Sequence, residues 1–254
     1  MQKKKILLKI GSNTLTKETD QISRGKIEDI GRQIAALKDS YDIIIVSSGA
    51  IAAAKQFVKL EHNGAEINVK QALAAIGQPH LMRIYQENFR ELGLFTSQCL
   101  LSYSDFENPI AKANIKNTIN VLVANNVIPI INENDTVAAD EIQFGDNDKL
   151  AALTAALLQV DLLIVATNTD GIYTKVSIEN NDPKTITSVS GLENLRQEIS
   201  SVKSSHGTGG MHSKIEAATI AQNVGIETWI VNGLKDNFLI DALNGIGNHT
   251  KIKS

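Results

Sequence analysis

The chain has 254 residues, 43% hydrophobic, 21% charged and 4% aromatic, with 25 basic and 28 acidic side chains and a formal charge of -3. The mild charge and few aromatic rings argue against a nucleic-acid surface, the single Cys99 excludes an intramolecular disulfide, and no apolar run reaches the ~18 residues of a membrane span. We therefore expect a cytoplasmic globular protein that binds neither nucleic acid nor membrane, with room for one large domain or two small ones.

Short apolar runs rich in β-branched residues alternate with amphipathic stretches along most of the chain. Consecutive apolar residues are typical of parallel strands buried on both faces, and apolar residues three and four apart are typical of helices. Strands are expected at 5–10, 42–46, 95–101, 127–131, 162–166 and 227–231, and helices at 25–38, 69–92, 110–126, 149–158 and 211–224. We expect Pro79 to break or kink the second helix. The alternation predicts an α/β fold, an open, mostly parallel twisted sheet sandwiched between helices in three layers (αβα).

Two polar stretches interrupt this pattern, at residues 132–148 and 167–210. The first contains a candidate strand at 141–144, and the second contains turn signals such as Asp170-Gly171. Functional residues of parallel sheets lie in such irregular segments, at the carboxyl ends of the strands. The candidate site is therefore expected in these loops.

The first two strands end in small residues that favour an anion. Lys9 lies near the end of an apolar strand, where it is costly unless it meets an anion, and Gly11 lets a phosphate approach the backbone. The alternative is a lysine that only extends to solvent. In Ser47-Ser48-Gly49 the following helix start favours an anion, although Ser48 could equally be a simple N-cap.

The sequences INENDTV (131–137) and GDND (145–148) place several carboxylates and amides in one polar neighbourhood. Asp135 could receive a cationic group, and Asp148 could cap the next helix or orient a nearby lysine. Asn and Asp also form ordinary turns, which is the alternative for each segment taken alone.

The glycine-rich sequence TGGMHSK (208–214) leads directly into a helix that carries Lys214 in its first turns. Its N–H groups could hold phosphate oxygens, although a flexible surface loop is the alternative. It is not a Walker A loop, the chain has no G-x-G-x-x-G or G-x-S-x-G, and its five histidines lack zinc spacing. We expect no metal site made by the protein itself.

Two lysines at phosphate-friendly loops and several amides indicate phosphoryl transfer from a nucleotide to an anionic acceptor. This chemistry requires positioning and charge neutralisation, with Mg²⁺ bridging the nucleotide phosphates.

The motifs KIGS, SSGAIAA, INENDTV with GDND, and TGGMHSK together resemble the amino acid kinase superfamily and, within it, the glutamate 5-kinase family, over about residues 5–233. The resemblance implies transfer of phosphate from ATP to L-glutamate, giving L-glutamyl 5-phosphate in the first step of proline biosynthesis. It also implies one amino acid kinase domain over 1–254, with acceptor binding at roughly 1–160 and nucleotide binding at roughly 161–254.

The same resemblance implies a role for individual residues. Lys9 and Lys214 match lysines on the transferring phosphate, and Asp148 matches the aspartate that organises them. Ser48, Asp135 and Asn147 match glutamate-binding positions. The matches to nucleotide-binding positions are Lys9, Thr167, Asn168, Thr208, Gly209, Gly210, Met211, His212, Ser213 and Lys214.

Three departures from the family accompany these matches. Asn168 stands where the family usually has Asp, Ser47 stands where it usually has Thr, and we expect a form without the C-terminal PUA domain that many relatives carry. The resemblance further implies a homo-oligomer, a dimer or tetramer, and feedback inhibition by proline.

Two other readings stay open at this point. The acceptor could be aspartate, N-acetylglutamate, carbamate or UMP, although INENDTV and GDND argue against these. The second alternative is a non-catalytic sensor of a nucleotide or an amino acid. Such a sensor is expected to lose the lysines that bind the phosphate, but Lys9 and Lys214 are both present.

Overall fold

A single eight-stranded sheet organises the computed structural model, which describes residues 3–60, 66–137, 147–192 and 210–254. The strands are β1 (Lys4–Ile10), β2 (Tyr41–Ser47), β3 (Phe95–Leu101), β4 (Val127–Glu133), β5 (Leu162–Thr167), β6 (Ser188–Val189), β7 (Glu227–Asn232) and β8 (Thr250–Ile252). Their order is β3-β4-β2-β1-β5-β7-β8-β6, and all neighbours are parallel except β7 and β8. The expected open, mostly parallel sheet is confirmed.

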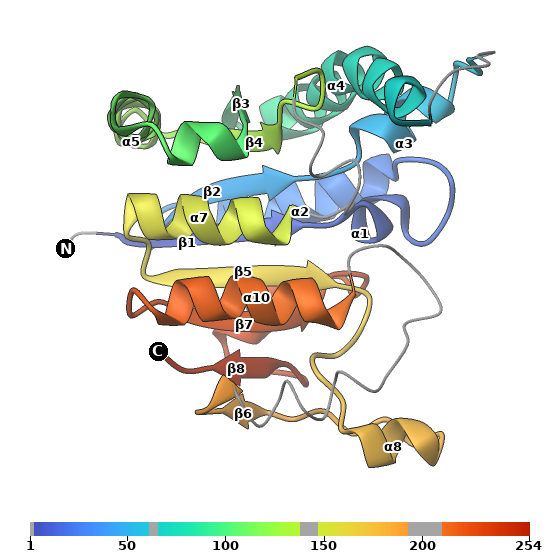
Figure 1. Ribbon diagram of the computed structural model, residues 1–254, viewed down its shortest axis with the longest axis vertical. Coiled ribbons are helices and arrows are strands. Elements are labelled where there is room, and N and C mark those ends of the chain that lie inside the picture. Colours follow the sequence, from blue (N-terminus) through green and yellow to red (C-terminus); the bar gives the residue numbers. More distant parts are fainter. Residues whose placement is uncertain (1–2, 61–65, 138–146, 193–209) are drawn as a thin grey trace.

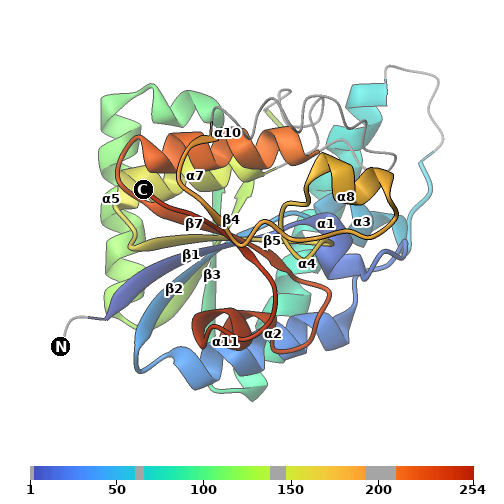
Figure 2. The same ribbon diagram turned by 90° about the horizontal axis from the view of Figure 1, so that it is seen from below.

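Helices cover both faces of this sheet (Figures 1 and 2). They are α1 (Ser12–Thr16), α2 (Arg24–Leu37), α3 (Ala50–Lys55), α4 (Glu66–Glu91), the 3-10 helix η1 (Tyr103–Phe106), α5 (Pro109–Ala124), α7 (Asp148–Leu158), α8 (Lys175–Glu179), α10 (Met211–Gln222) and α11 (Phe238–Leu243). In Figure 2, α7 and α10 lie above the sheet and α2 and α11 lie below it, which confirms the three layers. Among the described residues, no helix is long and apolar enough to cross a membrane.

The pleat of β1 sends alternate side chains to the two faces. Ile6, Leu8 and Ile10 join the core under α2, α4 and α11, whereas Leu7 joins the core under α7 and α10. The same alternation places Lys9, two residues after Leu7, on the α7–α10 face.

The expected break at Pro79 does not occur, because α4 runs through this residue from Glu66 to Glu91. Pro79 and Ala75, the residue whose carbonyl loses its helical partner, are both exposed, so water can satisfy that carbonyl. Close packing also holds this part of the helix in place. A Cβ on Gly77 would lie 1.8 Å from the backbone oxygen of Ala50 in α3, so only glycine fits at this crossing.

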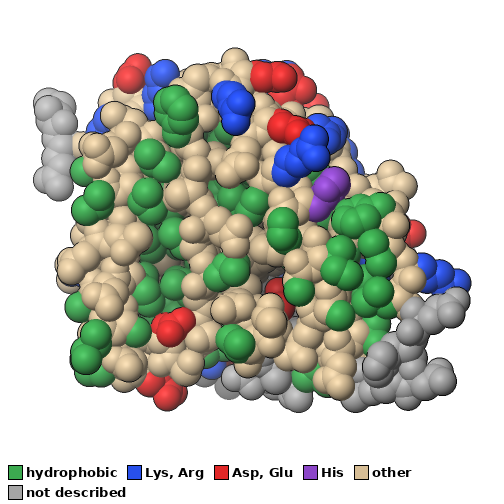
Figure 3. Space-filling view, turned by 90° about the horizontal axis from the view of Figure 1, so that it is seen from above, with side chains coloured by type: hydrophobic (Ala, Val, Ile, Leu, Met, Phe, Trp, Pro, Cys, Tyr) green, Lys and Arg blue, Asp and Glu red, His purple; other side chains and the backbone are tan. Residues whose placement is uncertain are grey.

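The surface at the β3 edge of the sheet carries many hydrophobic side chains. Figure 3 looks onto this face, where hydrophobic side chains are spread among other residues and the charged ones lie mainly toward the rim. Phe95 on β3 is 68% exposed and Ile110 on α5 is 73% exposed. Of the residues of α5, only Ile119 is buried. The α5 helix therefore leaves most of its surface uncovered.

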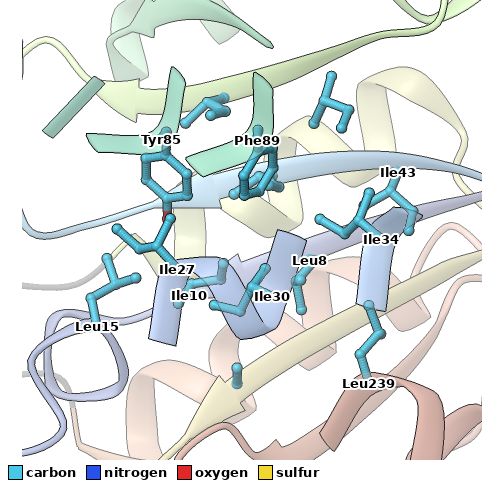
Figure 4. Close-up of a cluster of buried hydrophobic side chains, with 14 of the residues drawn as sticks. Leu8, Ile10, Leu15, Ile27, Ile30, Ile34, Ile43, Tyr85, Phe89 and Leu239 are labelled. Carbon is cyan, nitrogen blue, oxygen red and sulfur yellow. The ribbon is translucent and has the colours of Figure 1, made fainter. Parts of the chain in front are cut away.

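The core under α2 and α4 reaches the end of β2 that borders the candidate site. Figure 4 shows Tyr85 and Phe89 of α4 above the isoleucines of α2, and the two rings meet edge to face with centroids 5.6 Å apart. Burial raises the pKa of the Tyr85 hydroxyl, which therefore stays protonated and hydrogen-bonds Ser47 Oγ at 2.9 Å. Core packing thus fixes the carboxyl end of β2.

Candidate functional site

The neighbouring parallel strands β4, β2, β1 and β5 all end on the same side of the sheet, so their carboxyl ends lie together. The arrowheads of β2 and β5 point to the same side in Figure 1, and the register pairs Ile10 at the end of β1 with Ser47 of β2 and Ala166 of β5. The helices α7 and α10, which begin next to this edge, pack against each other. Segments far apart in the sequence therefore contribute side chains to one place.

Asp148 lies between the two lysines that the sequence singled out. Its Oδ1 is 2.5 Å from Lys9 Nζ, and its Oδ2 is 3.0 Å from Lys214 Nζ and accepts a 3.0 Å hydrogen bond from Ser213 Oγ. The exposed fractions are 0% for Asp148, 3% for Lys9 and 7% for Lys214. Within the described part of the chain, this site brings two buried ammonium groups to one carboxylate in a low-dielectric environment, where ammonium groups can hold an anion.

The structure bears on the alternatives given for Asp148 and Ser48. Asp148 is the first residue of α7, one after the N-cap residue Asn147, and its carboxylate contacts both lysines. The residue at the N-cap position of α3 is Gly49, with a φ of 108° that favours glycine, so Ser48 is not that cap. Ser48 Oγ instead accepts a 3.1 Å hydrogen bond from Asn147 Nδ2.

Asn147 is bound into a set of buried amides. Its Nδ2 donates to Ser47 O at 3.1 Å, to Ser48 Oγ at 3.1 Å and to Asn132 Oδ1 at 2.8 Å. Asn132 Nδ2 in turn donates to Gln78 Oε1 at 2.8 Å. Asn132 and Gln78 were not among the predicted site residues, and no local pattern marks Gln78, because it lies within a long helix 54 positions before its partner.

Asp135 follows β4 two residues after the buried Glu133. Burial, reinforced by the nearby Glu133 carboxylate, raises the pKa of Asp135 from 3.8 to about 6. The protein alone thus places two carboxylates close together in a partly dry environment, which favours a cation between them.

Thr167 and Asn168 end β5 beside the loop that follows α1. The Asn168 amide donates to Glu18 Oε1 at 3.0 Å, and Thr167 O accepts from the backbone N–H of Gly233 at 2.8 Å. Glu18, in the left-handed region at a φ of 61°, is a neighbour that the sequence did not predict.

The glycine-rich segment is described only from Gly210 onward. Gly210 is the extended N-cap residue of α10, Met211 and His212 begin the helix, and Ser213 and Lys214 reach Asp148. Thr208 and Gly209, like the candidate strand at 141–144, lie outside the described residues.

The chain matches the model of the amino acid kinase family over residues 4–232. It is 41% identical over 244 residues to the glutamate 5-kinase of Alkaliphilus metalliredigens (strain QYMF), a match that covers 95% of this chain and 92% of that protein. It is 39% identical over 247 residues to the glutamate 5-kinase of Neisseria gonorrhoeae (strain NCCP11945), covering 95% of this chain and 83% of that protein.

Solved structures show the same fold at low sequence identity. The carbamate kinase of Giardia lamblia bound to AMP-PNP has a TM-score of 0.69 at 18% identity, with 99% of each chain covered. The UMP kinase from Ureaplasma parvum has a TM-score of 0.64 at 19% identity, with 100% of each chain covered. The predicted fold is therefore confirmed.

The raised pKa of Asp135 gives a test in the unliganded protein. The folded state binds this proton more tightly than the unfolded state, so ionised Asp135 destabilises the fold, increasingly as the pH rises from about 4 to above 6. Asp135→Asn removes this penalty. Its stability relative to the wild type should therefore increase by about 2 kcal/mol between pH 4.5 and pH 7.5, as measured by urea unfolding. A difference that does not change with pH would contradict the raised pKa.

Proposed function

The chain belongs to the amino acid kinase family, and on this premise we propose that it transfers the γ-phosphate of ATP to the side-chain carboxylate of L-glutamate. The products are ADP and L-glutamyl 5-phosphate, the first intermediate of proline biosynthesis. The observation that carries this proposal is the buried Lys9–Asp148–Lys214 cluster, which brings two ammonium groups together where the strands end. The similarity to glutamate 5-kinases over 95% of the chain supports glutamate as the acceptor.

Lys9 and Lys214 neutralise the charge on the phosphoryl group as it moves between two anions. In a dry site, fixed ammonium groups act without solvent reorganisation at the moment of transfer. Asp148 pairs with both ammonium groups and so offsets the electrostatic repulsion between them. No general base is needed, because the acceptor carboxylate is already ionised at pH 7.

Ser48, Asn147 and Asp135 bind L-glutamate in this proposal. Asp135 supplies a countercharge for the substrate's ammonium group, which an N-acylated acceptor lacks. The raised pKa of Asp135 supports this role, because a cation beside the carboxylate offsets the cost of ionising it in a partly buried place.

ATP binds on the β5 and α10 side of the cluster. We assign to it Lys9, Thr167, Asn168, the described residues Gly210, Met211, His212, Ser213 and Lys214, and also Thr208 and Gly209. Mg²⁺ supplies charge neutralisation when bound with the nucleotide. Among the described residues, no group of three His, Cys, Asp or Glu side chains could hold a metal ion. Both Asp148 oxygens contact lysines, so we expect the nucleotide phosphates to be ligands of Mg²⁺.

We further propose a single cytoplasmic domain with acceptor binding over roughly residues 1–160 and nucleotide binding over roughly 161–254, inhibited by proline. The β3 face, the surface of β3 and α5 that includes the exposed Phe95, Ile110 and Val121, is the proposed contact surface of a homo-oligomer. Its support is the uncovered α5 helix and the exposed Phe95, since apolar surface of this kind favours association. β3 is also an edge strand of the described sheet.

Purified protein should form a hydroxamate from L-glutamate, ATP, Mg²⁺ and hydroxylamine, because the acyl phosphate product reacts with hydroxylamine. Aspartate and N-acetylglutamate serve as alternative acceptors in the same assay, and ADP release with carbamate and UMP completes the panel. A product with one of these but not with L-glutamate would refute the assignment.

Lys214→Ala should lower kcat by about 100-fold or more and change the KM for L-glutamate by less than about threefold, because its charge acts on the transferring phosphate. The matched control is Lys149→Ala, which removes an exposed lysine next to Asp148 and should leave both constants near wild type. A Lys214→Ala variant that raises only the KM for L-glutamate would contradict this role.

Phe95→Glu and Val121→Glu should each shift the protein toward the monomer in sedimentation equilibrium, because a charge is costly in an apolar interface. Val224→Glu, at an exposed valine outside the β3 face, is the control. A wild-type protein that sediments as a monomer at micromolar concentration would refute the proposed surface.

A further inference from the structure

A chain of side-chain amides leads from the middle of α4 to the proposed glutamate site. Gln78 on α4 bonds Asn132 near the end of β4, and Asn132 bonds Asn147 just before α7, each at 2.8 Å. Their exposed fractions are 7%, 3% and 1%, respectively. Water therefore competes little for these hydrogen bonds, and the three amides constrain one another.

Hydrogen bonds to backbone groups identify which end of each amide is the oxygen and which is the nitrogen. Asn132 Oδ1 accepts from the backbone N–H of Glu133 at 2.9 Å, and a backbone N–H can only donate, so this atom must be the oxygen. The Asn132 atom that faces Gln78 is then the nitrogen, and Gln78 must offer its oxygen. At the other end, Asn147 Nδ2 donates to the carbonyl of Ser47, which can only accept.

This ordering leaves one acceptor for a ligand. With Nδ2 of Asn147 turned toward Asn132 and Ser48, its Oδ1 is buried and has no hydrogen-bond partner among the described residues. A group that meets this oxygen must donate a hydrogen bond. Of the polar groups of L-glutamate, the ammonium donates and the two carboxylates only accept.

We propose that Gln78 is a positioning residue that, through Asn132, holds the Asn147 amide with its oxygen available to the ammonium group of the acceptor. This inference rests on the proposed function, since it takes L-glutamate as the acceptor. It adds a residue from a helix that contributes none of the predicted site residues. Selectivity for an amino acid over a plain dicarboxylate then depends on the direction of the Asn147 amide as well as on Asp135.

Stability alone does not explain a glutamine at position 78. Gln78 Nε2 is buried and has no hydrogen-bond partner within the described part of the chain, which destabilises the fold relative to a well-packed apolar side chain. A residue that costs stability locally while orienting a polar neighbour is typical of functional sites.

The test compares Gln78→Met, which keeps the length but removes the acceptor, with Gln78→Glu, which keeps an oxygen toward Asn132. Gln78→Met should raise the KM for L-glutamate about tenfold and leave the KM for ATP within twofold. Gln78→Glu should remain within about threefold of wild type for L-glutamate. Gln86→Met, at an exposed glutamine of the same helix, should match the wild type.

Glutarate, which is L-glutamate without its ammonium group, separates positioning from general damage to the site. Its inhibition constant against L-glutamate should change less than twofold in Gln78→Met, so the preference for L-glutamate over glutarate falls. Circular dichroism melting identifies a variant that fails to fold, in which case Gln78→Ala replaces Gln78→Met in the same comparison.

Three results would overturn the inference: an unchanged KM for L-glutamate in Gln78→Met, equal losses in Gln78→Met and Gln78→Glu, or equal losses for L-glutamate and glutarate. A wild-type protein inactive on L-glutamate but active on another acceptor would instead overturn the proposed function. Even then, the direction of the Asn147 amide gives a prediction. Gln78→Met should weaken binding of the true acceptor only if that acceptor carries a hydrogen-bond donor that meets Asn147 Oδ1.

Discussion

The buried carboxylate of Asp148 is the interaction on which the candidate site depends. Two lysine ammonium groups could not be held so close together in the interior without a negative charge between them. Lys9 comes from a strand at the start of the chain, and Lys214 from a helix near its end, so the cluster ties β1, α7 and α10 together. The same contact that fixes these three elements also brings together the two ammonium groups that phosphoryl transfer uses.

The geometry of a single strand explains how such a cluster can form in an apolar sheet. Because side chains alternate along β1, Lys9 leaves the sheet on the α7–α10 side, and its neighbours Leu8 and Ile10 pack on the other side under α2. A shift of register by one residue would place Lys9 among the isoleucines of α2 and remove it from Asp148. The apolar pattern of β1 therefore specifies the site as well as the core.

Much of the fold follows from local sequence, but the connections inside the site do not. The six predicted strands lie within two residues of the observed ones. The central ones are largely apolar runs buried on both faces, whereas β3, at the edge, is mostly exposed or half-buried. The short β6 and β8, with only two and three residues, carry no such run. Pro79 does not break α4, because tertiary packing at Gly77 holds the helix in place and the exposed Ala75 leaves its carbonyl within reach of water. The loops around Lys9, Asp148 and Lys214 could be predicted from their residue types, whereas Gln78 could not, since its importance comes only from a partner on another element.

The acceptor side and the nucleotide side of the proposed site carry charges of opposite sign. Near the end of β4, Glu133 and Asp135 make the electrostatic potential more negative where an ammonium group would lie. Lys9 and Lys214 make it more positive where phosphate oxygens would lie. Separating the two signs within one site lets a substrate of mixed charge bind in only one orientation, with its ammonium toward the carboxylates and its reacting carboxylate toward the lysines. The ionised Asp135 lowers the stability of the unliganded fold, and so does Gln78 Nε2, which has no hydrogen-bond partner among the described residues; the first of these penalties decreases when a cation binds. Such a site favours a zwitterionic acceptor over a simple anion. Part of the binding free energy then comes from the substrate's ammonium group, which reduces the free-energy penalty of the ionised Asp135 in the folded chain.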